Sequence, residues 1–411
     1  MDLAQDARRI TRTLFTAQGL ASAAKVAMYP VMTIIGARLS GRLSWAGVPA
    51  MVYLLGQAFS AYGWGFLMDR LGRRPALVLG LLSGAAGGAV ALFSIEHQSF
   101  GLFLVGSLLI GFAISAVQLA RFVAAEVHLA AERGRAISNV VLGGAVGAIF
   151  GPILAGASGA LAKVTALQEL GGPFLVTTAL FAVGSLLVFA FLRPEPRTLS
   201  DAIVAANPDL VVAGRQRTVG EIFRAPAAIV ALAAMVLGQL VMQMLMVITP
   251  LHMRLHEHHI SSISVVISVH AVGMYAFSIF SGRLADRLGR GPVIFAGGVG
   301  LILASLSARL SPQVLPLSAA LFLLGLGWNF CYVAGSSLLA DQLMPAERGR
   351  TQGFSDLLIG LTSAAGSLGS GMIFAAVGYD TMTMVAAAVA VLPLALTAWW
   401  QIHTRPVPVA S

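Results

Sequence analysis

The sequence predicts an all-α membrane protein with twelve transmembrane helices in two six-helix bundles. Three observations support this prediction: the composition, the spacing of apolar segments and an internal repeat. The 411 residues are 57% hydrophobic and only 10% charged, with a mean hydropathy of +0.86. Apolar runs of about 20 residues, long enough to cross a ~30 Å hydrocarbon core as helix, recur from end to end. Strand-like alternation of polar and apolar residues is absent, which excludes a β-barrel.

The first six apolar runs are expected to form an N-terminal bundle over residues 1–192. They follow the segment MDLAQDARRITRTLF, which carries two acids and no small-residue cleavage site. We therefore expect a cytoplasmic tail rather than a cleaved signal peptide. The six runs lie at 13–36, 47–69, 74–95, 100–126, 137–161 and 172–192.

The last six runs are expected to form a C-terminal bundle over residues 225–411. Residues 193–224 join the halves and combine charge, proline and polar side chains, which predicts a cytoplasmic linker with one short surface helix. The six later runs lie at 225–250, 261–284, 291–309, 314–341, 350–376 and 380–402.

The net charge of +9 is distributed as in a membrane protein. If both termini are cytoplasmic, 19 of the 26 Lys and Arg residues lie in the tails and loops on that side, and five lie in the loops on the other. This is the positive-inside bias that sets orientation in the plasma membrane, the inner membrane of a prokaryote. It argues against a basic surface for nucleic acid.

Two short sequences each occur twice at almost the same spacing. GFLMDRLGRR begins at Gly65 and GRLADRLGRG at Gly282, an offset of 217. AERGR begins at Ala131 and again at Ala346, an offset of 215. Two independent sequences with nearly one offset indicate an internal duplication of six helices plus six.

The first repeated sequence, G-x-x-x-D-R-x-G-R-R, resembles the signature loop of the major facilitator superfamily. The resemblance spans the whole chain and implies two bundles that rock around a central cavity (the major facilitator fold), with these loops as gates. The alternative is that some of the arginines only set topology. The gating residues that the resemblance implies are Gly65, Asp69, Arg70, Gly72, Arg73, Arg74, Gly282, Asp286, Arg287, Gly289 and Arg290.

Several polar groups fall within the predicted spans, where an ionisable side chain costs free energy unless it is paired or hydrated. Such residues usually face a cavity, so we expect a coupling or cavity-lining role. Fixed ion pairs, hydration near a helix end and hydrogen bonds between helices are the alternatives. The ionisable candidates are Lys25, Arg121, Glu126 and Asp356, and the uncharged ones are Gln57, Gln118, Gln239 and Asn329.

The fifth run contains GAIFGPILAG, from Gly147 to Gly156. It resembles a glycine motif that is common in proton-driven antiporters. Small residues at this spacing also let two helices pack closely, and plain packing is the alternative reading.

Methionine and histidine gather between Met235 and Met274, which hold six of the 15 methionines and five of the eight histidines. Met242 and Met246 are four residues apart, as are His270 and Met274, so each pair shares a helix face. Thioether and imidazole groups suit monovalent copper. Packing is the alternative, because methionine also fills gaps between helices. The outer loop adds a possible capture group of His252, Met253, His256, His258 and His259, which solvation explains equally well.

M-x-x-x-M in the seventh run and H-x-x-x-M in the eighth resemble the CcoA-like copper importers of the same superfamily. The strings ITPLHM, HAVGMY, GLGWNF and RFVAAE also look like that group. The resemblance implies that Met242, Met246, His270 and Met274 handle copper. A sister branch resembles riboflavin importers, and one sequence does not divide the two branches.

The sequence therefore leads us to expect a secondary transporter that works by alternating access and imports copper through a Met/His path. Two alternatives stay open: a proton-coupled carrier of a small organic molecule, such as a flavin or an exported drug, and a metal sensor that transports nothing.

Cys331 is alone and no P-loop is present, so a cysteine metal site and an ATP-driven pump are not expected. We expect no enzymatic activity and no cofactor. The expected partners are the cargo and the lipid bilayer, with the protein acting as a monomer.

Overall fold

The computed structural model describes residues 3–129, 132–164, 168–206, 217–344 and 347–403, and all regular structure in these ranges is helical. The chain divides into two units. Unit 1 comprises Met1–Val212 with Glu257–Val265, and unit 2 comprises Ala213–His256 with Val266–Ser411. The linker predicted over residues 193–224 is thus shared between the units.

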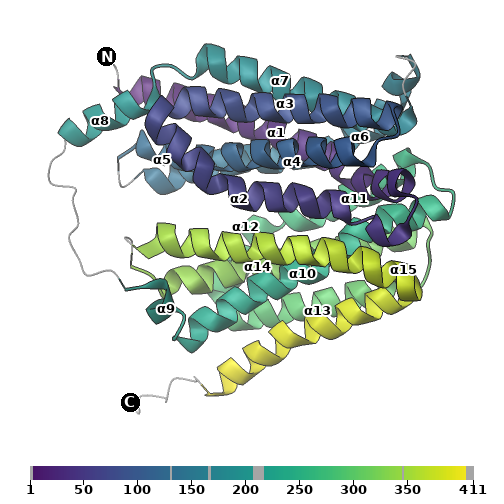
Figure 1. Cartoon of the computed structure of the whole chain (residues 1–411). Helices are drawn as coiled ribbons and strands as arrows, with labels where there is room; N and C mark the ends of the chain where they lie inside the picture. Colours follow the sequence, from purple (N-terminus) through teal and green to yellow (C-terminus); the bar gives the residue numbers. More distant parts are fainter. Residues whose placement is uncertain (1–2, 130–131, 165–167, 207–216, 345–346, 404–411) are drawn as a thin grey trace. The chain divides into compact units, whose positions relative to one another are not determined.

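Unit 1 is a bundle in which α1 packs against α6 and α7, α3 against α4 and α7, and α2 against α4 (Figure 1). Glycines allow these close contacts. A Cβ atom on Gly147 of α6 would lie 1.9 Å from the carbonyl oxygen of Gly19 in α1. The helices are α1 (Leu3–Ser40), α2 (Val48–Leu71), α3 (Arg73–Glu96), α4 (Phe100–Gln118), α5 (Ala120–Glu126), α6 (Arg133–Val164), α7 (Gly172–Phe191) and α8 (Pro196–Ala206), with short 3-10 turns at Leu43–Trp45 and Glu169–Gly171.

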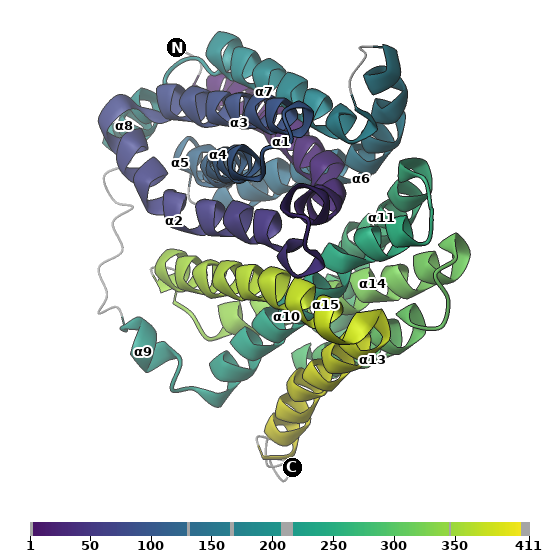
Figure 2. The same cartoon turned by 45° about the vertical axis from the view of Figure 1, so that its right-hand side comes forward.

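Unit 2 is a second bundle, in which α10 packs against α14 and α15, and α13 packs against the same two helices (Figure 2). Its helices are α9 (Val219–Ile222), α10 (Pro226–Leu255), α11 (Ile260–Tyr275), α12 (Ser278–Leu288), α13 (Arg290–Ala308), α14 (Val314–Asp341) and α15 (Arg348–His403). The first residues of α11 are grouped with unit 1.

Each of the twelve predicted spans corresponds to a helical stretch of the described residues. By length and apolar character alone, eight of the described helices can cross a membrane, and a ninth is added when α11 and α12 are taken as one bent span. The number is below twelve partly because α15 contains two predicted spans in one helix, with non-helical torsion angles at Gly378 (φ 79°, ψ 178°). In addition, α2 carries polar residues.

Two predicted spans are broken inside their length. The fourth is divided at Leu119, between α4 and α5, and the eighth is divided between Tyr275 and Ser278, where α11 ends and α12 begins. Breaks of this kind free backbone groups from the helix ladder and often mark sites in transporters. Arg121 and Met274 lie close to these two breaks.

Candidate functional site

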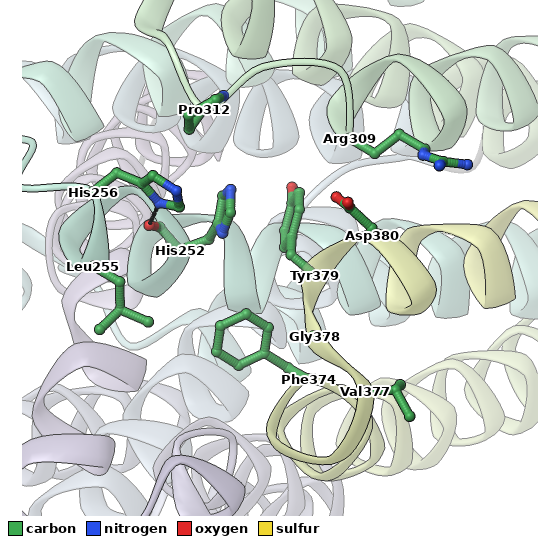
Figure 3. A pocket seen from close by; sticks show the side chains of 10 residues that line it. All are labelled: His252, Leu255, His256, Arg309, Pro312, Phe374, Val377, Gly378, Tyr379 and Asp380. Atoms are coloured by element: carbon green, nitrogen blue, oxygen red, sulfur yellow. Dashed lines mark hydrogen bonds between the residues drawn. The ribbon is translucent and has the colours of Figure 1, made fainter.

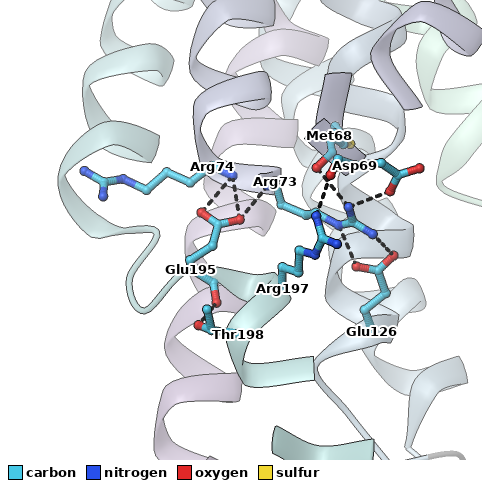
Figure 4. A network of polar contacts seen from close by, with 8 residues as sticks. All are labelled: Met68, Asp69, Arg73, Arg74, Glu126, Glu195, Arg197 and Thr198. Atoms are coloured by element: carbon cyan, nitrogen blue, oxygen red, sulfur yellow. Dashed lines mark hydrogen bonds and ion pairs between the residues drawn. The ribbon is translucent and has the colours of Figure 1, made fainter. Parts of the chain in front are cut away.

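The first repeated loop is organised around Arg73, at the start of α3 (Figure 4). Its guanidinium group donates to Asp69 Oδ1 at 2.8 Å and to the two carboxylate oxygens of Glu126 at 3.0 and 3.1 Å. A further hydrogen bond of 2.9 Å reaches the carbonyl oxygen of Met68. Arg73 thus joins the end of α2 to the end of α5, and Glu126, expected as a coupling residue, belongs to this network of contacts.

The first residues of the linker contact the same loop. Glu195 accepts hydrogen bonds from the backbone N–H groups of Arg73, at 2.5 Å, and Arg74, at 3.3 Å, so it caps the start of α3. Arg197 donates to the carbonyl oxygen of Asp69. Gly72 has φ +99°, and a Cβ atom there would lie 2.9 Å from the Glu195 carboxylate. The repeated glycine therefore serves both the left-handed turn and the close approach of the linker.

The second repeated loop has the same arrangement in unit 2. Arg290 donates to Asp286 Oδ1 at 2.5 Å and to Asp341 Oδ2 at 3.1 Å, at the end of α14. Gly289 also has positive φ, +91°. Asp341 follows Glu126 by 215 residues, the same offset as the AERGR repeat. The duplication therefore includes the carboxylate that lies outside the repeated loop.

The other residues of the two loops are less enclosed. Arg70 lies over the Phe66 ring at 4.3 Å, and Arg74 donates to the Phe189 carbonyl oxygen at 2.6 Å. Arg287 is exposed. Cβ atoms at Gly65 and Gly282 would meet open space, so no close packing explains these two glycines.

The charged residues of the predicted spans have different surroundings. Lys25 is half-buried in α1, and no ion pair to it occurs among the described residues. Arg121 lies 4.8 Å from the ring of Phe122. Asp356, in α15, accepts a hydrogen bond of 3.0 Å from the side chain of Gln352.

The four expected metal donors all belong to unit 2, on two helices. Met242 and Met246 of α10 are 7% and 8% exposed, and His270 of α11 is 1% exposed. Met274 is half-buried. The hydrogen bonds of the described residues tie His270 and Met274 to α14 rather than to α10.

His270 is held in one orientation with one ring nitrogen unused. Its Nδ1 lies 2.8 Å from the carbonyl oxygen of Leu321, which accepts, so Nδ1 carries the proton. The buried Nε2 atom has no hydrogen-bond partner among the described residues. A histidine whose Nδ1–H group is tied to a carbonyl presents Nε2 as an acceptor or a metal ligand.

Asn329 of α14 holds the break between α11 and α12. Its Nδ2 donates to the Met274 carbonyl oxygen at 2.6 Å and to Ser278 Oγ at 2.8 Å, and its Oδ1 accepts from Ser281 Oγ. The Asn329 side chain is 1% exposed. This expected cavity residue thus satisfies the backbone group that the break releases.

An aromatic group next to this break was not predicted as a site, although GLGWNF contains part of it. The rings of Trp328 and Tyr332 stack at 4.9 Å and 18°, and Tyr275 meets Trp328 edge to face at 6.5 Å. All three are half-buried. Trp328 Nε1 donates to Gln239 Oε1 at 2.7 Å. Because an indole N–H can only donate, the Gln239 oxygen must face it, and the amide NH₂ points away.

Of the five residues predicted as an outer capture group, only His252 and His256 line one cavity. His252 and His256 line a cavity of about 490 Å³ with Arg309, Tyr379 and Asp380, at the ends of α10 and α13 and at the break in α15 (Figure 3). The His252 ring stacks on Tyr379 at 3.9 Å. The other cavity residues are Leu255, Pro312, Phe374, Val377 and Gly378. Of the remaining three predicted residues, Met253 is fully buried, His259 is exposed and His258 is half-buried.

A conventional metal centre is not formed in the part of the chain that the structure describes. No group of three or more His, Cys, Asp or Glu side chains there is arranged to hold a metal ion. The predicted copper site consists of one histidine and three methionines. It is therefore not a group of three His, Cys, Asp or Glu side chains, and the absence of such a group does not test it.

Comparisons with known proteins agree with the repeat and the two bundles. A profile of the Major Facilitator Superfamily matches residues 14–261 and 231–411. YdeG of Bacillus subtilis (strain 168), described as an uncharacterized MFS-type transporter, is 34% identical over 395 residues, covering 94% of this chain and 91% of YdeG. The riboflavin transporter RfnT of Brucella anthropi is 31% identical over 377 residues, 92% of each chain. These likenesses do not support the finer assignment to CcoA-like copper importers.

Solved structures show the same fold. A crystal structure of a bacterial homolog of the human lysosomal transporter Spinster, inward-facing and occupied, has a TM-score of 0.75 over 97% of this chain and 98% of that one. At 15% identity this likeness concerns the fold alone. With both halves matched by the family profile and a relative 34% identical along nearly its whole length, the chain belongs to the Major Facilitator Superfamily and is a multi-pass membrane transporter.

Proposed function

We propose that this protein moves a small, planar heteroaromatic molecule such as riboflavin across the membrane by alternating access. The observation that carries the proposal is the aromatic group of Tyr275, Trp328 and Tyr332 beside the broken eighth span. Stacked aromatic rings gain about 0.5–1.5 kcal/mol beyond the burial of their area. Half-buried rings at a helix break are therefore suited to bind a flat ring system.

A polar group beside these rings can orient the cargo. The NH₂ group of Gln239 points away from Trp328 and can donate to a carbonyl oxygen of the cargo. Few polar groups among many apolar ones are typical of small-molecule sites. RfnT, which is named a riboflavin transporter and is similar over 92% of its length, supports the same chemical class.

The test is uptake of labelled riboflavin by purified protein in proteoliposomes. Wild-type protein is expected to take it up, and Trp328→Ala to lose at least about tenfold in uptake, because one stack and one oriented amide are lost together. Trp399→Ala is the matched control, since Trp399 is an exposed tryptophan of α15 outside this group. Absence of riboflavin uptake by the wild type would rule out this cargo.

Monovalent copper is the second candidate, and His270 favours it. A buried imidazole with its Nδ1–H group on a carbonyl and a bare Nε2 suits a soft metal, and Met274 lies one turn further along α11. In this proposal Met242, Met246, His270 and Met274 pass copper inward as cargo. Weak thioether ligands also allow its release, which a transport site requires.

Copper uptake by the same vesicles separates the two candidates. Met242→Ala and His270→Ala are expected to reduce it sharply, while Met235→Ala and Met244→Ala, which are as deeply buried, serve as packing controls. Equal losses at all four methionines would indicate packing. A protein that binds copper but exchanges neither cargo would instead be a sensor.

The proposal includes an orientation and an oligomeric state. We propose the cell inner membrane, with both termini cytoplasmic, because this places 19 of 26 Lys and Arg residues on the cytoplasmic side. Reporter fusions at the C-terminus and after Arg309 are expected to give opposite results.

One chain carries both bundles, so we propose a monomer, which size determination in detergent would test.

A further inference from the structure

The second AERGR copy contains a fully buried glutamate whose role the gate does not explain. Glu347 lies between α14 and α15 and is 0% exposed, whereas its counterpart in the first copy, Glu132, is exposed. A buried carboxylate must find charged or hydrogen-bonding partners, because its desolvation is costly. The partners of Glu347 therefore identify what this copy of the motif does.

The main partner is Arg217, at the end of the linker. Its Nε and a terminal nitrogen donate to the two carboxylate oxygens of Glu347 at 2.9 and 2.7 Å, and its backbone N–H donates at 2.9 Å. The backbone N–H of Met344 adds a bond of 3.0 Å. The Arg217 guanidinium, followed by these backbone donors, lowers the pKa of Glu347 to about 2. The ion pair is thus fully formed at neutral pH.

Arg217 also reaches the end of α14. The same terminal nitrogen donates to the carbonyl oxygen of Gln342 at 2.7 Å. Gln342 directly follows Asp341, the carboxylate that binds Arg290 in the second gating loop. In return, Arg350 of the AERGR motif donates to the carbonyl oxygen of Arg217. One side chain of the linker therefore holds both the motif and the helix end that carries a gating carboxylate.

We propose that Arg217 is a positioning residue of the second gate: anchored on Glu347, it holds the end of α14 so that Asp341 meets Arg290. The linker is then a working part of the gate and not only a tether. Its first residues act comparably in unit 1, where Glu195 and Arg197 contact the first loop. Glu132 is exposed, so the two copies of AERGR differ in the surroundings of their glutamates.

A double-mutant cycle tests the proposal without any cargo. Melting temperatures in detergent would be measured for Arg217→Gln, Arg290→Gln and the double variant. If Arg217 positions the Asp341–Arg290 pair, the combined loss is smaller than the sum of the two single losses. Arg224→Gln is the matched control, because Arg224 is an exposed linker arginine near Glu221, and its effect is expected to add to that of Arg290→Gln. Additive losses for Arg217 as well would overturn the proposal.

A charge swap separates positioning from simple anchoring. Arg217→Glu combined with Glu347→Arg restores an ion pair between linker and motif, but a carboxylate at 217 cannot donate to the Gln342 carbonyl. We expect the swap to recover part of the melting temperature while the coupling to Arg290 stays lost. Recovery of that coupling as well would contradict a role through Gln342.

Transport supplies the last readout, and only this measurement rests on the proposed cargo. Arg217→Gln is expected to slow riboflavin counterflow about tenfold with an unchanged KM, whereas Arg224→Gln keeps the wild-type rate. A changed KM at an unchanged rate would contradict a gating role. If wild-type protein does not carry riboflavin, the cargo proposal fails while the double-mutant cycle still decides the role of Arg217.

Discussion

Arg73 and Glu126, 53 positions apart in the chain, bind each other through two hydrogen bonds of 3.0 and 3.1 Å. Arg290 and Asp341 form the corresponding ion pair in unit 2. Each arginine also binds the aspartate of its own loop, four residues earlier. In these two pairs the arginine side chains are 15% and 23% exposed, and the carboxylates are 35% and 50% exposed. Partly exposed ion pairs contribute modestly to stability.

We predict that Asp69→Asn and Asp286→Asn leave the protein folded but slow its cycling. An amide in place of the carboxylate removes one negatively charged partner of Arg73 or Arg290. The contact between the helix ends of that bundle is therefore weakened. Exposed pairs of this kind contribute about 0.2–1 kcal/mol, so the melting temperature should change little. Counterflow rates equal to wild type in both variants would show that the aspartates do not gate.

Glu126→Gln is predicted to resemble Asp69→Asn in its effect. Because Glu126 is bound to Arg73, its loss should slow exchange with and without a pH gradient alike. A variant that exchanges normally but no longer accumulates cargo would instead make Glu126 a coupling residue.

Asp356 is the remaining candidate for proton coupling. We predict that accumulation of cargo depends on a pH gradient, and that Asp356→Asn abolishes this dependence while it spares counterflow. Gln352→Ala, which removes the hydrogen bond from the Gln352 side chain to Asp356 but keeps the carboxylate, should leave the coupling in place. Accumulation that is indifferent to the gradient in the wild type would make Asp356 a structural residue.

The glycine motif of α6 makes a prediction about stability. Gly147→Ala would bring a Cβ atom to 1.9 Å from the Gly19 carbonyl oxygen, so the α1–α6 contact must open. Overpacking of this kind costs about 1–3 kcal/mol. Gly63→Ala in α2 is the control, since its Cβ atom meets open space and alanine favours helix by about 1 kcal/mol. Melting temperatures should therefore move in opposite directions.

Acid should weaken the contact between Arg217 and Glu347. The folded-state pKa of Glu347 is about 2, below its ordinary value of 4.5, so the ion pair stabilises the protein above pH 4.5 and is lost as the pH falls towards 2. The melting temperature of wild-type protein should exceed that of Glu347→Gln above this window, and the difference should shrink within it. A difference that is constant from pH 7 to pH 3 would contradict the ion pair.

Much of the architecture followed from the sequence because the bilayer constrains it strongly. A chain in lipid must satisfy its backbone hydrogen bonds within each span, so apolar runs of about 20 residues predict helices. The offset of 217 between Gly65 and Gly282 predicted the duplication. The linker composition predicted one short helix, where the structure has two, α8 and α9. The breaks at Leu119 and between Tyr275 and Ser278 were not predicted, whereas the break at Gly378 falls between the predicted spans 350–376 and 380–402.

The sequence by itself determined the helical membrane fold, the duplication, the two repeated loops and the superfamily. Only the tertiary structure decided which distant residues meet: Glu126 with Arg73, Arg217 with Glu347, and Trp328 with Gln239. The physical reason is that hydropathy and local spacing determine where a helix begins and which residues share its face. The partner of a buried charge or an aromatic ring depends instead on how the helices pack, and neither hydropathy nor local spacing records that packing.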